Sequence, residues 1–484
     1  MRDILKELAL TEFDHRKLWH NLVLFLVVLM CVMICFSASE MRDEDIEYPI
    51  DTAHGKDFWV QQFDAFEKGQ LNIDVEPSDE LAALENPYDP AQREGIYYLW
   101  DRAYYEGNYY SYFGIAPILT VYYPYYYLTG ALPSIATACL YMAAAAMLFL
   151  GLFYRELLIR FCRGANLWLA AALLVGSAFS AGVFVSLAWS DSYYVAVISA
   201  IEWSMIFLFL AFRAMRARNT ALRAVLLALS AAALTMTVWS RPTVALMCLF
   251  VVPIFVFYAF DKKINIKDKI ISISSFAVPL CIGAFAVMWY NAARFGSPLD
   301  FGSAYQLTVS DISKNKLDIS MLGDSLYHFF FRGAAPTGKF PFFETVYISP
   351  EYDRYFYTAK AVGAFSFGIP AAALFAPFAC GPKKEPCKFV TLLLGGALCV
   401  FVAFFDYCYA GLDLRYIIDI LPMLTLIGAV TLLCAHKEAH GLKSVRLSGI
   451  ITVIIIILCI VSVLMTVGVT RMNPSSHIFP IITE

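Results

Sequence analysis

Apolar runs of about twenty residues recur along this chain and limit what it can fold into. The first, Leu18–Ala38, reads LWHNLVLFLVVLMCVMICFSA, and a helix of that length covers the roughly 30 Å of hydrocarbon in a bilayer. Ten further runs follow at 132–154, 167–188, 191–212, 222–240, 242–260, 270–290, 358–380, 389–405, 416–434 and 447–470. Hydrophobic residues make up 60% of the sequence and charged residues 16%, which is unusual for a soluble domain. The sequence therefore predicts an all-α, polytopic membrane helix bundle of about eleven transmembrane helices.

The short loops between these runs indicate the orientation of the helices. Lys and Arg outnumber Asp and Glu in the loops that contain YRELLIRFCR, RAMRARNTALR, DKKINIKDK, GPKKEPCK and HKEAHGLKSVR, which all fall on the same side as the N-terminal segment 1–17. Basic loops of this kind face the cytoplasm. We therefore expect a multi-pass protein of the cell membrane with a cytoplasmic N-terminus, seven helices within 18–290 and four within 358–484. The long loops 39–131 and 291–357 are expected outside.

The end of the first long loop is rich in tyrosine, with twelve tyrosines between Tyr97 and Tyr127. Tyrosine has an apolar ring and a polar tip, which suits the headgroup level of a membrane. We therefore predict a juxtamembrane helix over 114–128 that lies along the outer interface, with a broken transmembrane helix as the alternative. A second, amphipathic helix is predicted over 57–68, because the apolar side chains of DFWVQQFDAFEK recur at helical spacing.

Several classes of chemistry receive no support from the sequence. The twelve cysteines lie almost entirely in predicted helices or at their cytoplasmic ends, and neither long loop contains one, so disulfides cannot order those loops. No Cys or His spacing indicates a metal site, and neither a phosphate-binding glycine loop nor a nucleophile elbow occurs. Soluble ATP-driven chemistry is therefore not expected, and neither is a nucleic-acid partner.

Ionisable residues gather at the predicted outer ends of separate helices. The acids are Asp51, Asp57, Asp64, Asp101, Glu106, Asp191, Asp413 and Asp419, and the cations are Arg241, Arg294 and Arg415. A charge near the hydrocarbon is costly and usually has a partner or a function. Because these residues share one membrane depth, we expect them to form a site at the outer face.

Four short motifs, taken with this topology, carry a resemblance to a known family. They are AFEKGQL after the first juxtamembrane helix, SDSYY between two spans, WYNAARFGSPLDFG after the seventh span and RYIIDILP in a late span. Together they resemble the glycosyltransferase-C superfamily, especially bacterial polytopic enzymes similar to protein O-mannosyltransferases and the aminoarabinose transferase. The resemblance implies an enzyme that transfers a hexosyl or pentosyl group from a polyprenyl-phosphate donor to an extracytoplasmic acceptor, which is a cell-envelope glycan, a lipid or a protein. It also implies inversion at the sugar carbon.

This reaction requires a general base for the acceptor hydroxyl and cations for the departing phosphate. Asp57 is our first choice for the base and Asp51 the second, since DTAHGKD stands where the family usually carries an adjacent acidic pair. The predicted substrate-binding residues are Asp101, Asp191, Arg241, Arg294, Arg415 and Tyr416, of which Arg241 and Arg415 are best placed to bind phosphate. No cofactor is certain, and the resemblance leaves open whether a divalent metal ion takes part.

Structural roles are alternatives for these residues. Asp57 and Asp191 stand where helix caps are expected, and Asp101 could close a turn with Gly107. Arg241 could reach lipid phosphates, and Arg415 could pair with a neighbouring acid, Asp413 or Asp419. Glu202, inside a span, is expected to be a hydrogen-bonded residue of the bundle.

Two other functions remain open at the level of sequence. A transporter or flippase for a polyprenyl-linked saccharide would also place charges among helices, but such proteins often have repeated halves and sites at the midplane. A non-catalytic membrane scaffold that has lost the acidic pair is the third hypothesis. A sugar-transfer assay with a lipid-linked donor separates the three, because neither alternative forms product.

Overall fold

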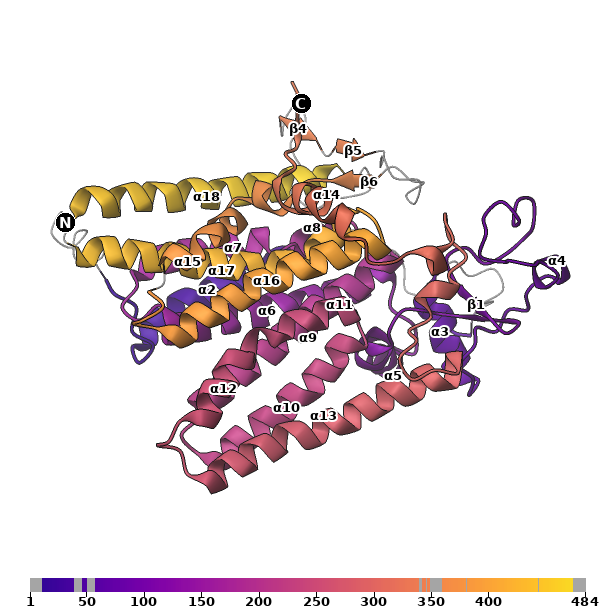
Figure 1. Cartoon of the computed structure of the whole chain (residues 1–484), viewed down its shortest axis with the longest axis horizontal. Helices are drawn as coiled ribbons and strands as arrows, with labels where there is room; N and C mark the ends of the chain where they lie inside the picture. The colour runs from indigo at the N-terminus through magenta and orange to yellow at the C-terminus, as the bar shows by residue number, and fades with distance from the viewer. Residues whose placement is uncertain are drawn as a thin grey trace.

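A computed structural model describes residues 11–38, 46–49, 57–338, 342–344, 346–348, 359–379, 381–442 and 444–472 of the chain. Among these residues, ten helices are long and apolar enough to cross a membrane. The long helices run side by side, and α3, α4 and β1 lie beyond one end of them (Figure 1). The predicted polytopic helical bundle is confirmed.

The long helices overlap ten of the eleven predicted spans. They are α2 (Leu18–Ala38), α6 (Ile135–Phe161), α7 (Leu167–Ser180) with α8 (Val183–Ala188), α9 (Ser192–Arg216), α10 (Thr220–Val238), α11 (Pro242–Ala245) with the 3-10 helix η2 (Leu246–Val251) and α12 (Val252–Phe260), α13 (Ile266–Phe295), α16 (Pro386–Tyr409), α17 (Leu414–Gly441) and α18 (Val445–Arg471). Gly182 separates α7 from α8 with a left-handed φ of +82°, a conformation that glycine adopts readily. The span predicted at 167–188 is therefore a helix with one break.

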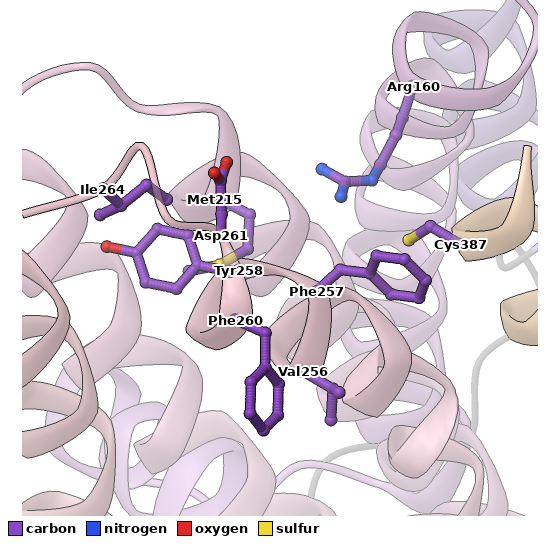
Figure 2. Close-up of a pocket in the computed structure, with 9 residues that line it drawn as sticks. All are labelled: Arg160, Met215, Val256, Phe257, Tyr258, Phe260, Asp261, Ile264 and Cys387. Carbon is purple, nitrogen blue, oxygen red and sulfur yellow. The ribbon is translucent and has the colours of Figure 1, made fainter.

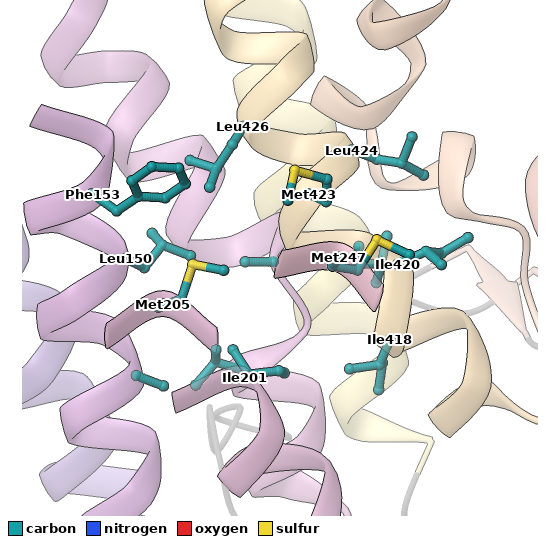
Figure 3. Close-up of a cluster of buried hydrophobic side chains, with 14 of the residues drawn as sticks. Leu150, Phe153, Ile201, Met205, Met247, Ile418, Ile420, Met423, Leu424 and Leu426 are labelled. Carbon is teal, nitrogen blue, oxygen red and sulfur yellow. The ribbon is translucent and has the colours of Figure 1, made fainter. Parts of the chain in front are cut away.

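The core of the bundle is apolar and centres on α17. Side chains of α6, α9, η2 and α17 meet there, including Phe153, Met205, Met247 and Met423 (Figure 3). Most of α17 is buried, whereas α18 and α13 expose long rows of apolar side chains. Such rows suit helices that face lipid, since the bilayer core is itself apolar.

The span predicted at 358–380 differs from a regular helix. Its described part consists of β6 (Ala359–Ala361), the 3-10 helices η7 (Ala364–Phe367) and η8 (Ile369–Phe375) and α15 (Ala376–Ala379). Gly368 has a φ of +80°, and Pro370 follows in the first turn of η8. The segment packs so closely on α17 that a Cβ at Gly428 would lie 2.2 Å from the carbonyl oxygen of Ile369. The described residues therefore contain ten regular spanning helices and one broken apolar segment, not eleven regular helices.

The two predicted juxtamembrane helices are both present. The first is α3 (Phe58–Glu67), and it is buried through Ala65 against the rest of the protein. It is therefore an internal helix and not the surface helix that its amphipathic pattern predicts. The tyrosine-rich helix consists of a π-helical turn, η1 (Ile118–Tyr122), and α5 (Tyr123–Thr129), which ends at Gly130.

The two predicted outer loops pack against each other. In the first loop, α4 (Asp79–Ala82) precedes a hairpin of β1 (Ala103–Tyr105) and β2 (Asn108–Tyr110), in which Tyr104 pairs with Tyr109. Backbone bonds join Asp101 N–H to the Leu307 carbonyl at 3.0 Å and Leu307 N–H to the Arg102 carbonyl at 2.9 Å. A small apolar cluster unites Ile73, Leu81, Leu99, Tyr104, Tyr109 and Leu307. Packing of the two loops against each other, and not only contact with a membrane, therefore orders this region.

Short elements complete the second loop and lead back to the bundle. They are the 3-10 helices η3 (Ser303–Tyr305), η4 (Ile312–Lys314) and η5 (Ile319–Met321), the helix α14 (Leu322–Leu326), the π-helix η6 (Tyr327–Phe331) and the strands β3 (Ala335–Pro336), β4 (Phe343–Glu344) and β5 (Val346–Ile348). Strand β3 pairs with β4 and β5 with β6, both antiparallel.

Candidate active site

Asp57 lies at the N-terminus of α3, beside the beginning of α9. Its Oδ1 accepts the N–H of Trp59 at 2.8 Å, so it caps α3 as the sequence suggests. The indole Nε1 of Trp59 donates to the carbonyl of Ser192 at 2.8 Å, which ties the start of α3 to the first residue of α9. Helix capping thus holds the Asp57 carboxylate at the end of the bundle where the two predicted outer loops lie.

The environment of Asp57 makes its carboxylate a stronger base than an ordinary aspartate. Desolvation by burial raises its pKa from 3.8 to about 6, although the N–H groups of Trp59 and Val60 and the charge of Arg102 oppose the shift. A base with a pKa closer to neutrality takes a proton more effectively and is still largely ionised at pH 7. Asp51, the second choice for the base, lies outside the described residues.

Asp101 is a buried carboxylate with two tyrosine donors. Its Oδ2 accepts the hydroxyl of Tyr193 at 2.5 Å and that of Tyr112 at 3.3 Å. Its Oδ1 is buried and has no hydrogen-bond partner among the described residues. The backbone of Asp101 has a φ of +58°, which is strained for a residue other than glycine. Asp101 therefore does not close a turn with Gly107, and its carboxylate retains an acceptor for a further group.

The next residue, Arg102, stabilises the contact between this segment and α3. Its Nε and Nη2 donate to Oε1 of Gln61 at 3.0 and 2.5 Å, and its Nη1 donates to the carbonyl of Trp100. Its guanidinium carbon lies 3.5 Å from the ring centroid of Phe58. Burial lowers the pKa of Arg102 to about 10, while Asp101 and Asp57 attract its charge. Arg102, which no sequence motif marks, is therefore a cation attracted by both Asp57 and Asp101.

Asp191 and Arg415 stand on the neighbouring helices. Asp191 caps α9, since its Oδ1 accepts the N–H groups of Tyr193 and Tyr194 at 2.8 and 3.1 Å. Burial raises the pKa of Asp191, and the charge of Arg415 opposes this shift. The guanidinium carbon of Arg415 lies 4.3 Å from the ring centroid of Tyr193, and its Nη2 donates to the Tyr416 hydroxyl at 3.4 Å. The ring of Tyr193 thus joins Arg415 to Asp101.

Arg241 forms a buried ion pair below these residues. Its Nη2 lies 2.6 Å from Oδ2 of Asp419 on α17, and its guanidinium carbon lies 5.5 Å from the ring centroid of Tyr416. The charge of Arg241 also acts on Asp406, in the last turn of α16. The ion pair of Asp419 is therefore formed with Arg241. Asp406 escaped the sequence analysis because a single acid after a span has no distinctive pattern.

Arg294 has a different environment from the other predicted cations. Its Nη1 donates to the carbonyl of Ser111 at 2.6 Å, and its Nη2 and Nε donate to Asn291 and to the carbonyl of Tyr290. It also lies over the Tyr290 ring, with its guanidinium carbon 3.8 Å from the ring centroid. These contacts anchor α13 to the segment that follows β2. The hydrogen bonds use all three guanidinium nitrogens of Arg294, and its predicted substrate-binding role stays a prediction.

Seven of the predicted residues lie in one polar network, whereas Asp64 pairs with Lys68 outside it. The network runs from Asp57 through Arg102, Asp101 and Tyr193 to Arg415, Tyr416, Arg241 and Asp419, with Asp191 beside it. Glu202 lies apart from it within α9, and its Oε2 has no hydrogen-bond partner among the described residues. Across the described part of the chain, no group of three or more His, Cys, Asp or Glu side chains could hold a metal ion. The network thus combines carboxylates with guanidinium groups, and the described residues contain no cluster of metal ligands.

Comparison with known proteins identifies the fold. No protein-family model matches the sequence, and no curated protein matches it. The oligosaccharyltransferase of Archaeoglobus fulgidus in its apo form matches with a TM-score of 0.52 and 12% identity, over 96% of this chain and 57% of that chain. The same enzyme tethered to an acceptor peptide with an NVT sequon matches with a TM-score of 0.50 and 13% identity, over 95% and 55%. This chain thus spans slightly more than half the length of that enzyme.

A further match is ArnT from Cupriavidus metallidurans bound to undecaprenyl phosphate, with a TM-score of 0.43 and 10% identity, over 92% of this chain and 75% of that chain. The fold assignment rests on the two oligosaccharyltransferase structures, whose TM-scores are higher. At this low identity the comparison shows the fold alone: the chain shares the fold of that oligosaccharyltransferase. Membership of the glycosyltransferase-C superfamily stays the prediction drawn from its motifs.

Proposed function

We propose that this protein is a membrane glycosyltransferase that moves a sugar from a polyprenyl-phosphate donor to an acceptor on the outer side of the cell membrane. The observation that carries the proposal is the polar network at one end of a bundle with the fold of the matched oligosaccharyltransferase. One structure of the matched oligosaccharyltransferase is tethered to an acceptor peptide. At 12% and 13% identity this chain and that enzyme share the fold alone, so the donor, the acceptor and the reaction are our inference.

The general base in this proposal is Asp57, with Asp51 as the alternative. The base takes the proton of the acceptor hydroxyl while the hydroxyl oxygen attacks the anomeric carbon, and the bond from that carbon to the phosphate oxygen breaks with inversion. General-base catalysis contributes roughly 10²- to 10⁴-fold in rate. The raised pKa of Asp57 and its partial exposure suit this role. Capping of α3 through one oxygen keeps the carboxylate in position.

The donor phosphate in this proposal binds near Arg415, with Arg241 behind it. Arginine offers a planar fork of donors that matches phosphate oxygens. Asp419 holds the Arg241 guanidinium, and the Tyr416 ring lies near both arginines. Asp101 presents a buried carboxylate oxygen that has no described partner and suits a sugar or acceptor hydroxyl. Asp191 contributes negative charge beside the same tyrosines.

The transferase is preferred to a flippase because the described ionisable network lies at the ends of the helices and not halfway along them. A substrate that crosses the membrane requires polar groups at the midplane of the pathway. Arg415 and Asp191 stand in or directly before the first turn of their helices. This arrangement favours chemistry at one face.

Product formation tests the proposal. Purified protein is supplied with sugars linked to undecaprenyl phosphate, and transfer to water or to added acceptors is followed by mass spectrometry of the released sugar and lipid. We expect product with the wild type and at least a 100-fold loss with Asp57→Asn, at nearly unchanged donor binding. Wild-type protein that binds a polyprenyl-linked sugar but forms no product would contradict the transferase.

Membrane topology tests the location of the proposed site. Reporter fusions at positions 165, 218, 265, 385 and 440 are expected to report the cytoplasm, and fusions at 80, 320 and 478 the outside. A cytoplasmic signal from position 80 or 320 would place the network on the wrong face for an extracytoplasmic acceptor.

A further inference from the structure

A second candidate site lies at the opposite end of the bundle, where α6, α9 and α12 end and α16 begins. A cavity of about 670 Å³ is lined by Arg160, Met215, Val256, Phe257, Tyr258, Phe260, Asp261, Ile264 and Cys387. Its volume is within the range of small-molecule sites. None of these residues belongs to the polar network, so the proposed transferase does not explain the cavity.

The position of the cavity in the helices indicates its depth in a membrane. Arg160 precedes the last residue of α6, Met215 precedes the last residue of α9, and Phe260 ends α12. Cys387 is the second residue of α16. Because all four helices are candidate membrane spans, the cavity lies where the hydrocarbon meets the headgroups. The basic loops predict that this end is cytoplasmic.

One wall of the cavity is apolar and accessible. Val256, Phe257 and Phe260 are 45%, 43% and 80% exposed, and all three are on α12. Exposed phenylalanines at the end of a membrane helix suit contact with acyl chains, since they would be unfavourable in water. A lipid is therefore a better occupant for this wall than a water-soluble metabolite.

The charged groups that line the cavity are one cation, Arg160, and one anion, Asp261. Arg160 lies near the end of α6 and makes no hydrogen bond or ion pair with the described residues. Figure 2 shows its guanidinium directed from α6 toward the end of α12, which carries Phe257 and Tyr258 and is followed by Asp261. Asp261 is exposed, and its Oδ1 accepts the N–H of Lys263 at 2.9 Å. Its other carboxylate oxygen remains available to a ligand.

We propose that this cavity binds a phospholipid with a phosphoethanolamine headgroup. The Arg160 guanidinium binds the phosphate through its forked donors, and the Asp261 carboxylate accepts hydrogen bonds from the ammonium group. The acyl chains lie against Phe257 and Phe260. The acid distinguishes this headgroup from an anionic one such as phosphatidylglycerol, which Asp261 would repel. The site is independent of the proposed sugar transfer.

Lipid competition tests the proposal on the full-length protein. Wild-type protein is delipidated in detergent, and binding of phosphatidylethanolamine, phosphatidylcholine and phosphatidylglycerol with matched chains is measured by native mass spectrometry and by the lipid-dependent shift in melting temperature. We expect phosphatidylethanolamine to bind best. Phosphatidylcholine should bind more weakly because its quaternary ammonium cannot donate a hydrogen bond to Asp261.

Two substitutions separate the roles of the two charges. Arg160→Gln should weaken binding of all three lipids by about tenfold or more, because a charge-assisted bond to phosphate is lost. Asp261→Asn should abolish the preference for phosphatidylethanolamine over phosphatidylglycerol and leave binding of the latter equal or stronger. Arg446→Gln, a change of the same charge at the exposed start of α18, is the matched control and should leave binding unchanged.

The outcomes that would overturn the proposal are equally specific. A wild type that prefers phosphatidylglycerol, or an Arg160→Gln protein that binds phosphatidylethanolamine as the wild type does, contradicts it. If Arg160→Gln does not yield folded protein, Phe260→Ser is the second variant, since this side chain is 80% exposed and its loss should spare the fold. Unchanged lipid binding by Phe260→Ser would likewise reject the acyl contact.

Discussion

Asp57→Asn should separate stability from catalysis at the proposed base. The change removes the charge but keeps an oxygen that can accept the Trp59 N–H and cap α3. In the folded protein, desolvation raises the pKa of Asp57 from 3.8 to about 6. A shift of about two pKa units corresponds to on the order of 3 kcal/mol, so the ionised carboxylate destabilises the fold by up to that amount at neutral pH.

The direction of this effect with pH follows from proton binding. Between pH 4 and 6 the folded protein retains the Asp57 proton while the unfolded chain loses it, so stability decreases as the pH rises through this window. Asparagine carries no such charge. We therefore expect Asp57→Asn to melt at a higher temperature than wild type at pH 8, with a difference that shrinks below about pH 6 and vanishes below about pH 4. Turnover should fall at least 100-fold in the same protein.

The assay compares thermal unfolding in detergent from pH 4 to pH 8 with product formation from the lipid-linked donor. Asp311→Asn is the matched control, because Asp311 also caps a short helix through a hydrogen bond from a backbone N–H. Burial raises the pKa of Asp311, but hydrogen bonds from Ser313 and Asn86 outweigh this effect and lower it. Loss of its charge should therefore destabilise the protein at neutral pH. An Asp57→Asn protein with full turnover and a lower melting temperature at pH 8 would refute the reasoning and leave Asp57 as a helix cap.

Three further substitutions test other parts of the structure. Arg415→Lys keeps the charge but loses the forked donors, so donor use should weaken substantially at near wild-type melting temperature; a collapse of stability would indicate a structural role. Asp419→Ala leaves the buried Arg241 without its ion pair and should cost roughly 3–5 kcal/mol in unfolding experiments, whereas a neutral result would mean that the pair is solvated. Gly114→Ala would place a Cβ 1.7 Å from the Trp239 carbonyl oxygen and should lower the melting temperature clearly, and wild-type stability would contradict this close approach.

The sequence alone was sufficient for features that depend on short windows of the chain. Ten of the predicted spans, the helix α3, the tyrosine-rich helix and the capping roles of Asp57 and Asp191 all follow from hydropathy, helical spacing and local capping chemistry. Each of these properties involves residues only a few positions apart. The membrane depth shared by the acidic and basic residues followed from the same pattern, because the ends of spans define that depth.

The tertiary structure decided which of those residues meet. Asp101 bonds to Tyr193 and Arg241 pairs with Asp419, and these partners are 92 and 178 positions apart in the chain. Arg294 was predicted at the same outer end as Arg241 but donates to the carbonyl of Ser111 after β2, and Asp406 near Arg241 had no sequence signal. The segment at 358–380 was apolar enough to predict a helix, yet its close packing on α17 and the φ of Gly368 produced a broken one. Hydropathy reports how deep a residue lies in the membrane, but only the packing of the helices determines its partner at that depth.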